Sequence, residues 1–327
     1  MATESTLPAT MQAVVFDAPG DPDVLHVAEV PLPTPVIAES LVRVRAAGVN
    51  PIDAKTRSGY AAATTKQLQY PAIVGGDFSG ELVAAPYAAF PLQPGDEVYG
   101  MVTVPRWPGS YAQYVIAPHL TIARKPTNLT HEEAAAVPLA VLTAWGMLVD
   151  VARVHTGQRV LIHAGAGGVG HFAVQIARYF GAIVTATGSA RNQDFLRALG
   201  AHRTVDYTAE RFEDVVDEQD LVIDLIGNVR EDTGTRSLQV LRPGGLLVNA
   251  PTGSWPTMAE EAAAAGIEAT TYKLAPATGT LDTITRLFED GSLKVHVDKV
   301  YDFADAAEAH RQIESGSTRG KLVIRVP

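Results

Sequence analysis

The sequence predicts an α/β fold in two parts, a distorted β-barrel followed by a doubly wound parallel sheet. The first third of the chain holds short β-branched runs interrupted by Pro and Gly, as in PGD, LPTP and QPGDE, which is typical of antiparallel strands joined by tight turns. From residue 158 onward, uniformly apolar strands alternate with helices, which indicates a parallel sheet buried on both faces. A glycine-rich turn, GAGGVG, joins the first of these strands to its helix.

The expected barrel strands are short apolar runs between turn residues. They lie at Met11–Phe16, Leu41–Ala46, Phe78–Ala84, Glu97–Val104 and Tyr111–Ile116. The pattern changes near Leu129, because Thr130 is suited to cap a helix that carries two acids in its first turn and then an apolar run. This helix should open the second domain.

The second domain should be a series of strands and helices. The strands are expected at residues 160–164, 183–187, 221–226, 246–250 and 267–272, with helices between them. After two further helices, near 280–289 and 304–313, the chain ends in the strand LVIRV, and this β content suggests that the tail returns to the barrel. We therefore expect a split first domain of residues 1–124 and 275–327, and a second domain of residues 125–274.

The composition is that of a folded acidic protein. The chain has 327 residues, 46% of them hydrophobic, and 26 basic against 36 acidic residues give a net charge of −10. Nucleic acid is not expected as a partner, because phosphate binding requires a basic face. No apolar run reaches the roughly 18–20 residues of a membrane span, and the first ten residues lack the pattern of a signal peptide. We expect no membrane partner and a cytoplasmic protein.

The glycine turn, residues 165–170, favours dinucleotide binding. Glycine permits a tight turn and lets backbone N–H groups approach a pyrophosphate at a helix N-terminus. A tight βα turn without a ligand is the alternative. The end of the next strand reads Thr187 to Asn192 without an acid; a carboxylate there would hold the ribose of NAD(H). Ser189 and Arg191 are suited to donate to a 2′-phosphate, which favours NADPH. The alternative is that Ser189 only caps a helix and that Arg191 is a solvated residue at the start of that helix.

An enzyme that uses a nicotinamide cofactor also needs polar protein groups that orient its substrate or donate a proton to it. Without cysteine, and with nine His that show no metal-ligand spacing, we expect no metal. In the segment AGVNPIDAKTRSGY, Asn50 and Asp53 are candidates to orient cofactor or substrate, and Lys55 and Tyr60 to donate a proton or polarise a carbonyl. The alternatives are a turn at Asn50, a helix cap at Asp53, a solvated Lys55 and a packing role for Tyr60. We interpret His163 as a sheet residue and His171 as a helix-surface residue.

With these motifs in this order, the chain resembles the zinc-independent quinone oxidoreductase (zeta-crystallin-like) branch of the medium-chain dehydrogenase/reductase superfamily. The resemblance runs from Met11 to Pro327 through AGVNPIDAKTRSGY, VGGDFSGEL, PGDEVYGMV, GSYAQYV, AAAVPLAVLTAW, GQRVLIHAGAGGVGHFAVQIA, LGAHRTVDY, LVIDLIG, LRPGGLLV and GKLVIRV. Zinc-bearing relatives carry a ligand Cys at the place of Asn50 and Gly-His-Glu at the place of Gly75-Gly76-Asp77.

The resemblance implies a GroES-like catalytic domain and a Rossmann domain with the active site between them, NADPH as cofactor, and a homodimer. The cofactor contacts that it implies are Asn50 at the nicotinamide ribose, Thr143 at the nicotinamide amide, Ala166, Gly167, Gly168 and Val169 at the pyrophosphate, Ser189, Arg191 and Tyr207 at the 2′-phosphate, and Ile226 and Ala250 through their backbone. Tyr60, Lys55 and Asn50 are the candidate catalytic residues. With a lysine at position 55, the chain is more similar to the enone-reducing members of the family than to the simple quinone reductases.

The expected function is metal-free hydride transfer from NADPH to a small-molecule quinone or activated enone. The substrate pocket should include barrel loops and the segment Tyr60–Tyr70. The alternative is a catalytically weak NADPH-binding regulatory or structural protein of the same fold, because fold does not fix function.

Overall fold

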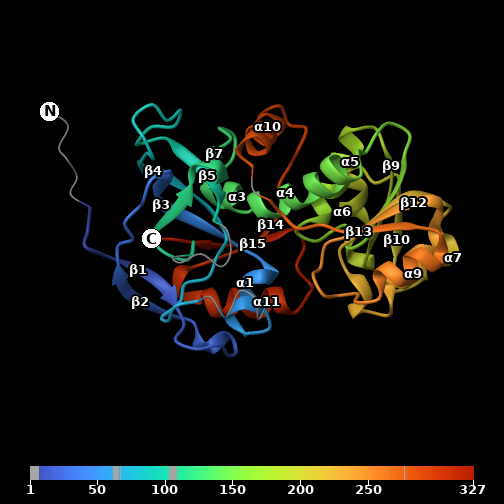
Figure 1. Cartoon of the computed structure of the whole chain (residues 1–327), viewed down its shortest axis with the longest axis horizontal. Helices are drawn as coiled ribbons and strands as arrows, with labels where there is room; N and C mark the ends of the chain where they lie inside the picture. Colours follow the sequence, from blue (N-terminus) through green and yellow to red (C-terminus); the bar gives the residue numbers. More distant parts are fainter. Residues whose placement is uncertain (1–6, 62–65, 67, 103–108, 276) are drawn as a thin grey trace. The chain divides into compact units, whose positions relative to one another are not determined.

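The chain folds into two compact units (Figure 1). The computed structural model describes residues 7–61, 66, 68–102, 109–275 and 277–327. Unit 1 comprises Met1–Leu139, Pro276–Glu289 and Val297–Pro327, and unit 2 comprises Ala140–Ala275 and Asp290–His296. The division thus falls after Leu139, whereas the sequence led us to expect it after residue 124.

Unit 1 is built around a sheet in which every pair is antiparallel except β14 with β15, which is parallel. Its strands are β1 (Thr10–Val15), β2 (His26–Pro31), β3 (Glu39–Val49), β4 (Asp77–Ala84), β5 (Glu97–Met101), β6 (Tyr114–Pro118), β7 (Ile122–Arg124), β14 (Val297–Tyr301) and β15 (Lys321–Arg325). The strand order is β14-β15-β3-β4-β5-β7, with β6 also paired to β3, and β1 and β2 form a separate hairpin. Residues 103 and 104, expected at the end of β5, lie outside the described residues.

The helices of unit 1 hold the ends of this sheet. They are α1 (Pro51–Arg57), α3 (His131–Ala135), α10 (Thr278–Glu289) and α11 (Ala306–Glu314). In Figure 1 the red β15 and α11 lie beside the blue β3 and α1, because β15 pairs antiparallel with β3 and α11 contacts α1. A Cβ at Gly48 would lie 2.3 Å from the carbonyl oxygen of Ala135. Only glycine therefore lets α3 pack on β3, which explains why residues 131–135 belong to unit 1.

Unit 2 is a parallel sheet with connecting helices. Its strands are β8 (Arg159–Ile162), β9 (Ile183–Gly188), β10 (Arg203–Asp206), β11 (Gln219–Asp224), β12 (Leu241–Asn249) and β13 (Glu268–Thr271). Their order is β10-β9-β8-β11-β12-β13, and every neighbouring pair is parallel. This order reverses between β8 and β11, as in a doubly wound dinucleotide-binding sheet. The predicted α/β fold is confirmed.

The helices of unit 2 follow the strands. They are α5 (Gly170–Tyr179), α6 (Gln193–Ala198), α7 (Phe212–Val215), α8 (Thr233–Ser237) and α9 (Met258–Ala265), and α4 (Pro138–Trp145) crosses the division between the units. The single helix expected after Thr130 is instead divided into α3, α4 and a π-helical turn at Gly146–Val151. Pro138 accounts for the first break, because proline has no N–H to donate within a helix and begins α4 instead. Throughout the described ranges, each helix is too short or too polar to span a lipid bilayer.

Candidate active site

The glycine turn follows β8 and opens α5, at the carboxyl edge of the parallel sheet. A Cβ at Gly170 would lie 2.1 Å from the Ala164 carbonyl oxygen, so packing requires glycine there. A Cβ at Gly165 would lie 2.9 Å from a Leu196 methyl group and 3.0 Å from the Ala186 Cβ, so these side chains would have to shift. At Gly167 the nearest atom to a Cβ is the Ala164 oxygen at 3.3 Å. Packing therefore does not by itself require glycine at 167, and the bare backbone there fits close approach of a phosphate, with the first N–H groups of α5 as donors.

The buried side chain of His163, directly before this turn, is held by hydrogen bonds on both ring nitrogens. His163 lies between the hydroxyl groups of Thr187 (3.2 Å to Nδ1) and Ser237 (2.9 Å to Nε2), and Thr187 also accepts the N–H of Ala164 at 3.2 Å. Burial lowers the pKa of His163 to about 4. The ring is therefore neutral at pH 7 and satisfied on both nitrogens, which agrees with its interpretation as a sheet residue.

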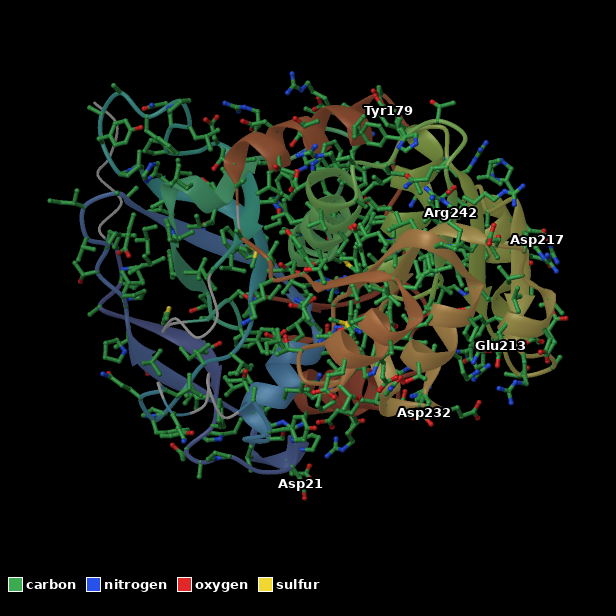
Figure 2. The ribbon with its side chains drawn as sticks, turned by 45° about the vertical axis from the view of Figure 1, so that its right-hand side comes forward. Asp21, Tyr179, Glu213, Asp217, Asp232 and Arg242 are labelled. Atoms are coloured by element: carbon green, nitrogen blue, oxygen red, sulfur yellow. The ribbon has the colours of Figure 1, made fainter. Side chains whose placement is uncertain are left out.

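Further contacts hold that region of unit 2. The His163 ring meets Phe212 edge-on at 4.6 Å between centroids, and the Arg236 guanidinium lies 4.8 Å from the centre of the same Phe212 ring. Arg236 forms two hydrogen bonds of 2.6 Å to the carboxylate of Glu213, which is labelled in Figure 2. His171, which we expected on the helix surface, is instead fully buried, and its Nδ1 lies 3.0 Å from the Gly167 carbonyl oxygen. That prediction was wrong, because all residues from Gly170 to Ala177 are buried, so this part of α5 has no exposed face.

Asp224 organises the next two strand ends and was missed by the sequence reasoning. Its Oδ1 accepts the N–H groups of Ile226 and Gly227, both at 2.9 Å, and its Oδ2 accepts Asn249 Nδ2 at 2.8 Å. Its carbonyl accepts the N–H of Ala250 at 3.0 Å. Ile226 thus follows β11, which borders the switch in strand order where ligands bind in such sheets, and Ala250 follows the adjacent strand β12. The signal was an acid that ends the apolar run LVID.

The residues that the sequence led us to expect at a 2′-phosphate follow β9 and β10. Arg191 and Tyr207 are exposed and Ser189 is half-buried. Ser189 occupies the N-cap position, but its hydroxyl makes no capping hydrogen bond and instead accepts Asn192 Nδ2 at 3.3 Å. The nearby acid, Asp206, accepts the N–H and hydroxyl of Thr208 at 3.0 and 2.6 Å.

In unit 1, three strand ends gather a buried polar cluster of Asn50, Asp53, Asp77 and Lys321. Val49 ends β3, Asp77 begins β4 and Lys321 begins β15, and β3 runs antiparallel to both neighbours, so these ends meet. Asn50 Nδ2 donates to Asp77 Oδ2 at 2.9 Å, and Lys321 Nζ donates to Asn50 Oδ1 and, at 3.0 Å, to the Val49 carbonyl.

Burial shapes the protonation of this cluster. It raises the pKa of Asp53 to about 7, and it also raises the pKa of Asp77, against the lowering effect of the Lys321 ammonium. It lowers the pKa of Lys321, against the raising effect of Asp77. Asp53 Oδ2 accepts the N–H of Asn50 at 2.8 Å and so completes a capping box on α1, which confirms the cap that we gave as the alternative.

The structure separates the sequence-predicted residues of unit 1 into two sets. Asn50 and Asp53 are buried in the cluster, whereas Lys55 is exposed and Tyr60 is 82% exposed, with their side chains on the surface of the unit. Residues 62–65 and 67 of the expected pocket segment lie outside the described residues. In unit 2, Thr143 lies on α4 and is 9% exposed. Asp77 and Lys321 were not predicted as site residues; the signal was a charge directly before an apolar residue at the start of each strand, since buried charges occur in pairs.

Comparison with known proteins gives consistent relatives over the whole chain. Residues 37–127 match the alcohol dehydrogenase GroES-like domain, and residues 199–324 match the zinc-binding dehydrogenase family. The mitochondrial NAD(P)H oxidoreductase RTN4IP1 of Danio rerio is 33% identical, over 97% of this chain and 91% of that protein. The chloroplastic NADPH-dependent alkenal/one oxidoreductase of Arabidopsis thaliana is 33% identical, over 99% and 82%. The structure of a quinone oxidoreductase from Coxiella burnetii superposes with a TM-score of 0.90 at 37% identity, over 97% and 100%.

The relatives correct one expectation. The names of the Danio rerio and Arabidopsis thaliana proteins place them in mitochondria and chloroplasts, so the cytoplasmic location expected from the sequence is contradicted. The physical reason is that an organelle address is carried by a leader segment that does not take part in the fold. The composition of the folded part therefore carries no information about it.

The residues present do not fit the zinc ion that one family name mentions. The chain contains no cysteine, and among the described residues no three His, Cys, Asp or Glu side chains are grouped to hold a metal ion. The cation that faces Asn50 and Asp77 is the ammonium of Lys321.

Proposed function

The chain belongs to the medium-chain dehydrogenase/reductase superfamily and is an oxidoreductase of that family, and from this premise we propose that it is an NADPH-dependent reductase of quinones or activated enones that uses no metal. Its relatives include a protein named as an alkenal/one oxidoreductase and a structure named as a quinone oxidoreductase. The proposal extends the reaction classes in these names to this chain.

The observation that carries the proposal is the chemistry at the end of β9. The side chains after this strand are Ser189 and Arg191, with Tyr207 after β10, and no carboxylate follows β9 before Asp194. A hydroxyl, a guanidinium and a phenol can all donate to a 2′-phosphate, whereas a carboxylate would repel it. This set favours NADPH over NADH.

The remaining roles follow from the two units taken separately. When bound, NADPH supplies the hydride from C4 of its nicotinamide. Backbone of residues 166–169 would hold the pyrophosphate, Thr143, Ile226 and Ala250 would line the nicotinamide half, and Asn50 would donate to the nicotinamide ribose. Lys55 and Tyr60, both exposed, are proposed to deliver the proton to the oxygen that gains negative charge when the quinone or enone accepts the hydride.

The proposal includes a homodimer. Strand β13 is the last strand in the order of the parallel sheet, and an unpaired strand edge is a ready surface for a second copy. Light scattering on the purified protein tests this part independently of activity.

The test of function is the absorbance of NADPH and NADH at 340 nm with a benzoquinone, a naphthoquinone, an alkenal and a cyclic enone, with a chelator present throughout. We expect chelator-resistant loss of NADPH absorbance with at least one acceptor, and slower loss with NADH. The best acceptor distinguishes quinone from enone. NADPH binding without turnover on this panel would contradict the proposal and favour a regulatory NADPH-binding protein.

A further inference from the structure

Lys321 is a buried ammonium beside a proposed cofactor contact. Its side chain is 3% exposed, and its Nζ is held by the Val49 carbonyl at 3.0 Å, by Asn50 Oδ1, and by Asp77 Oδ2 at 3.6 Å. A buried ammonium is costly unless it is paired and hydrogen-bonded. These partners lie at the end of β3 and the start of β4.

Asp77 holds the other side of the same amide. Its Oδ2 accepts Asn50 Nδ2 at 2.9 Å, and its Oδ1 accepts the N–H of Leu139 at 2.9 Å. The Asn50 amide therefore lies between a cation at its oxygen and an anion at its nitrogen. A reversed amide would face ammonium with N–H and carboxylate with oxygen, so only one orientation is compatible with these charges.

Stability alone does not account for this arrangement. The strands β15 and β3 are already paired from Leu322 with Val49 to Arg325 with Ala46, and both contribute to the apolar core of unit 1. Replacing a buried ion pair by apolar residues is often neutral or stabilising. What the pair does supply is a fixed amide: one N–H of Asn50 is used by Asp77, and no residue in the described part of the chain accepts the second N–H of the same nitrogen.

We propose that Lys321 and Asp77 are positioning residues that set the orientation of the Asn50 amide and thereby present its free N–H to the nicotinamide-ribose half of the cofactor. This inference rests on the proposed function, which assigns Asn50 to that half. Neither charged residue needs to touch the cofactor.

The test is the neutral variant Lys321→Met/Asp77→Asn, which removes both charges and keeps the side chains close in size. The Leu139 N–H still requires an acceptor, so the new amide at 77 turns its NH₂ group toward Asn50. The Asn50 amide should then reverse, with its oxygen toward residue 77. The variant thus changes the presented group while it leaves no unpaired buried charge.

The measurement compares two ligands that share the adenine half. We expect the variant to bind NADPH about 10-fold more weakly and adenosine 2′,5′-bisphosphate, which lacks the nicotinamide half, within about 2-fold of the parent. Asn50→Ala should have the same effect, and adding it to the double variant should weaken NADPH by no more than about 2-fold further, because residues that act through one another are not additive. Unchanged NADPH affinity, equal losses for both ligands, or additive effects would each overturn the proposal.

Lys125→Met is the matched control. Lys125 is also nearly buried in unit 1, at 6% exposed, with Glu97 Oε2 at 3.2 Å and the Pro126 carbonyl at 3.2 Å, but it lies outside the cluster. It should lower stability and leave the ratio of the two affinities unchanged.

A second measurement covers the case in which the neutral variant does not fold. In the parent protein, labelled with ¹⁵N-asparagine, NADP⁺ should shift the side-chain amide signal that is missing in Asn50→Ala, and adenosine 2′,5′-bisphosphate should not. An unshifted signal overturns the inference. Non-additive binding effects in a protein that turns over none of the acceptors would overturn the proposed function and leave this inference standing.

Discussion

At the scale of single residues, the sequence indicated two polar members of the buried cluster, Asn50 and Asp53, but not the charged side chains that contact Asn50. Asn50 and Asp53 stood out because they follow an apolar strand, and the cap formed by Asp53 was foreseeable from its spacing. Lys321 lies 271 positions from Asn50, and only the pairing of β15 with β3 brings them together. Contacts of this kind depend on the order of strands, which one sequence does not specify.

Asp53→Asn tests the burial of this carboxyl. The folded state raises its pKa from 3.8 to about 7, so the folded protein holds the proton more tightly than the unfolded chain does. Ionisation therefore costs stability progressively from about pH 4 to pH 7, and the cost is constant above pH 7. The amide oxygen of the variant side chain would keep the acceptor for the Asn50 N–H without that cost.

The expected result is that Asp53→Asn gains stability relative to the parent between pH 4 and pH 7, by an amount on the order of a few kcal/mol. Urea unfolding at pH 4.5, 6 and 7.5 measures it. The exposed Asp194→Asn, on α6, controls for the change of net charge. A difference between variant and parent that does not vary with pH would contradict the buried ionisation.

Arg191→Ala tests the choice of cofactor. If this guanidinium donates to the 2′-phosphate, its loss should weaken NADPH by about 10- to 100-fold, as expected for a charge-assisted hydrogen bond, and change NADH by less than about 2-fold. Fluorescence titration measures both affinities. Arg197→Ala, on α6 and paired with Asp194 at 2.7 Å, is the control for general loss of positive charge. Equal losses for both cofactors would remove Arg191 from the proposed site.

At the scale of elements, the glycine turn was located correctly, but the different roles of its glycines needed coordinates. Strand and helix around it were clear from the apolar pattern. The strands that the sequence did not predict, β2, β7 and β14, are short or mostly exposed: β2 has only Val30 buried and β14 only Tyr301. With few buried positions there is little alternation to detect, and pairing with neighbours is what makes them strands.

Gly170→Ala and Gly167→Ala should separate packing from binding. A methyl group at 170 would overlap the Ala164 carbonyl at 2.1 Å and force α5 away from β8, so we expect a loss of several kcal/mol of stability and of cofactor binding together. At 167 the closest approach is 3.3 Å, so stability should fall by no more than about 1 kcal/mol, while NADPH affinity falls at least about 10-fold because the methyl group keeps the pyrophosphate from the backbone. Thermal unfolding and titration measure the two effects. Full affinity in a stable Gly167→Ala protein would place the pyrophosphate elsewhere.

At the scale of the whole molecule, the fold class and the family resemblance followed from the sequence, because the order of the apolar strands and the motifs between them extends over both units. The exact division did not, since it depends on Gly48 admitting α3 against β3. The chain also crosses between the units more than once, as residues 290–296 belong to unit 2 and the residues on either side to unit 1. Turn residues mark where elements end, but they do not tell which core an element joins.

The stability of both units should depend on pH in the same way, because each unit contains a buried neutral histidine. Burial lowers the pKa of His163 to about 4 in unit 2, and burial with the nearby Arg57 lowers that of His310 to about 3 in unit 1. Because the unfolded chain binds these protons near pH 6.5 and the folded protein does not, the stability they contribute is complete above pH 6.5 and is lost as the pH falls toward these values.

His310→Phe should therefore flatten the acid dependence of stability. The phenyl ring can keep the edge contact with Tyr111, at 5.7 Å between centroids, while the hydrogen bond between Nε2 and the Tyr111 hydroxyl is lost, so at pH 7.5 the variant should be less stable by about 1 kcal/mol. Below pH 6.5 the parent should lose up to about 1.4 kcal/mol per pH unit more than the variant, so that the two curves cross near pH 6. Urea unfolding between pH 7.5 and pH 4.5 measures both curves. Asp53→Asn should make the loss of stability toward acid steeper, because the Asp53 carboxyl of the parent takes up a proton in the folded state. Parallel stability curves for the parent and both variants would show that neither His310 nor Asp53 titrates as its surroundings require.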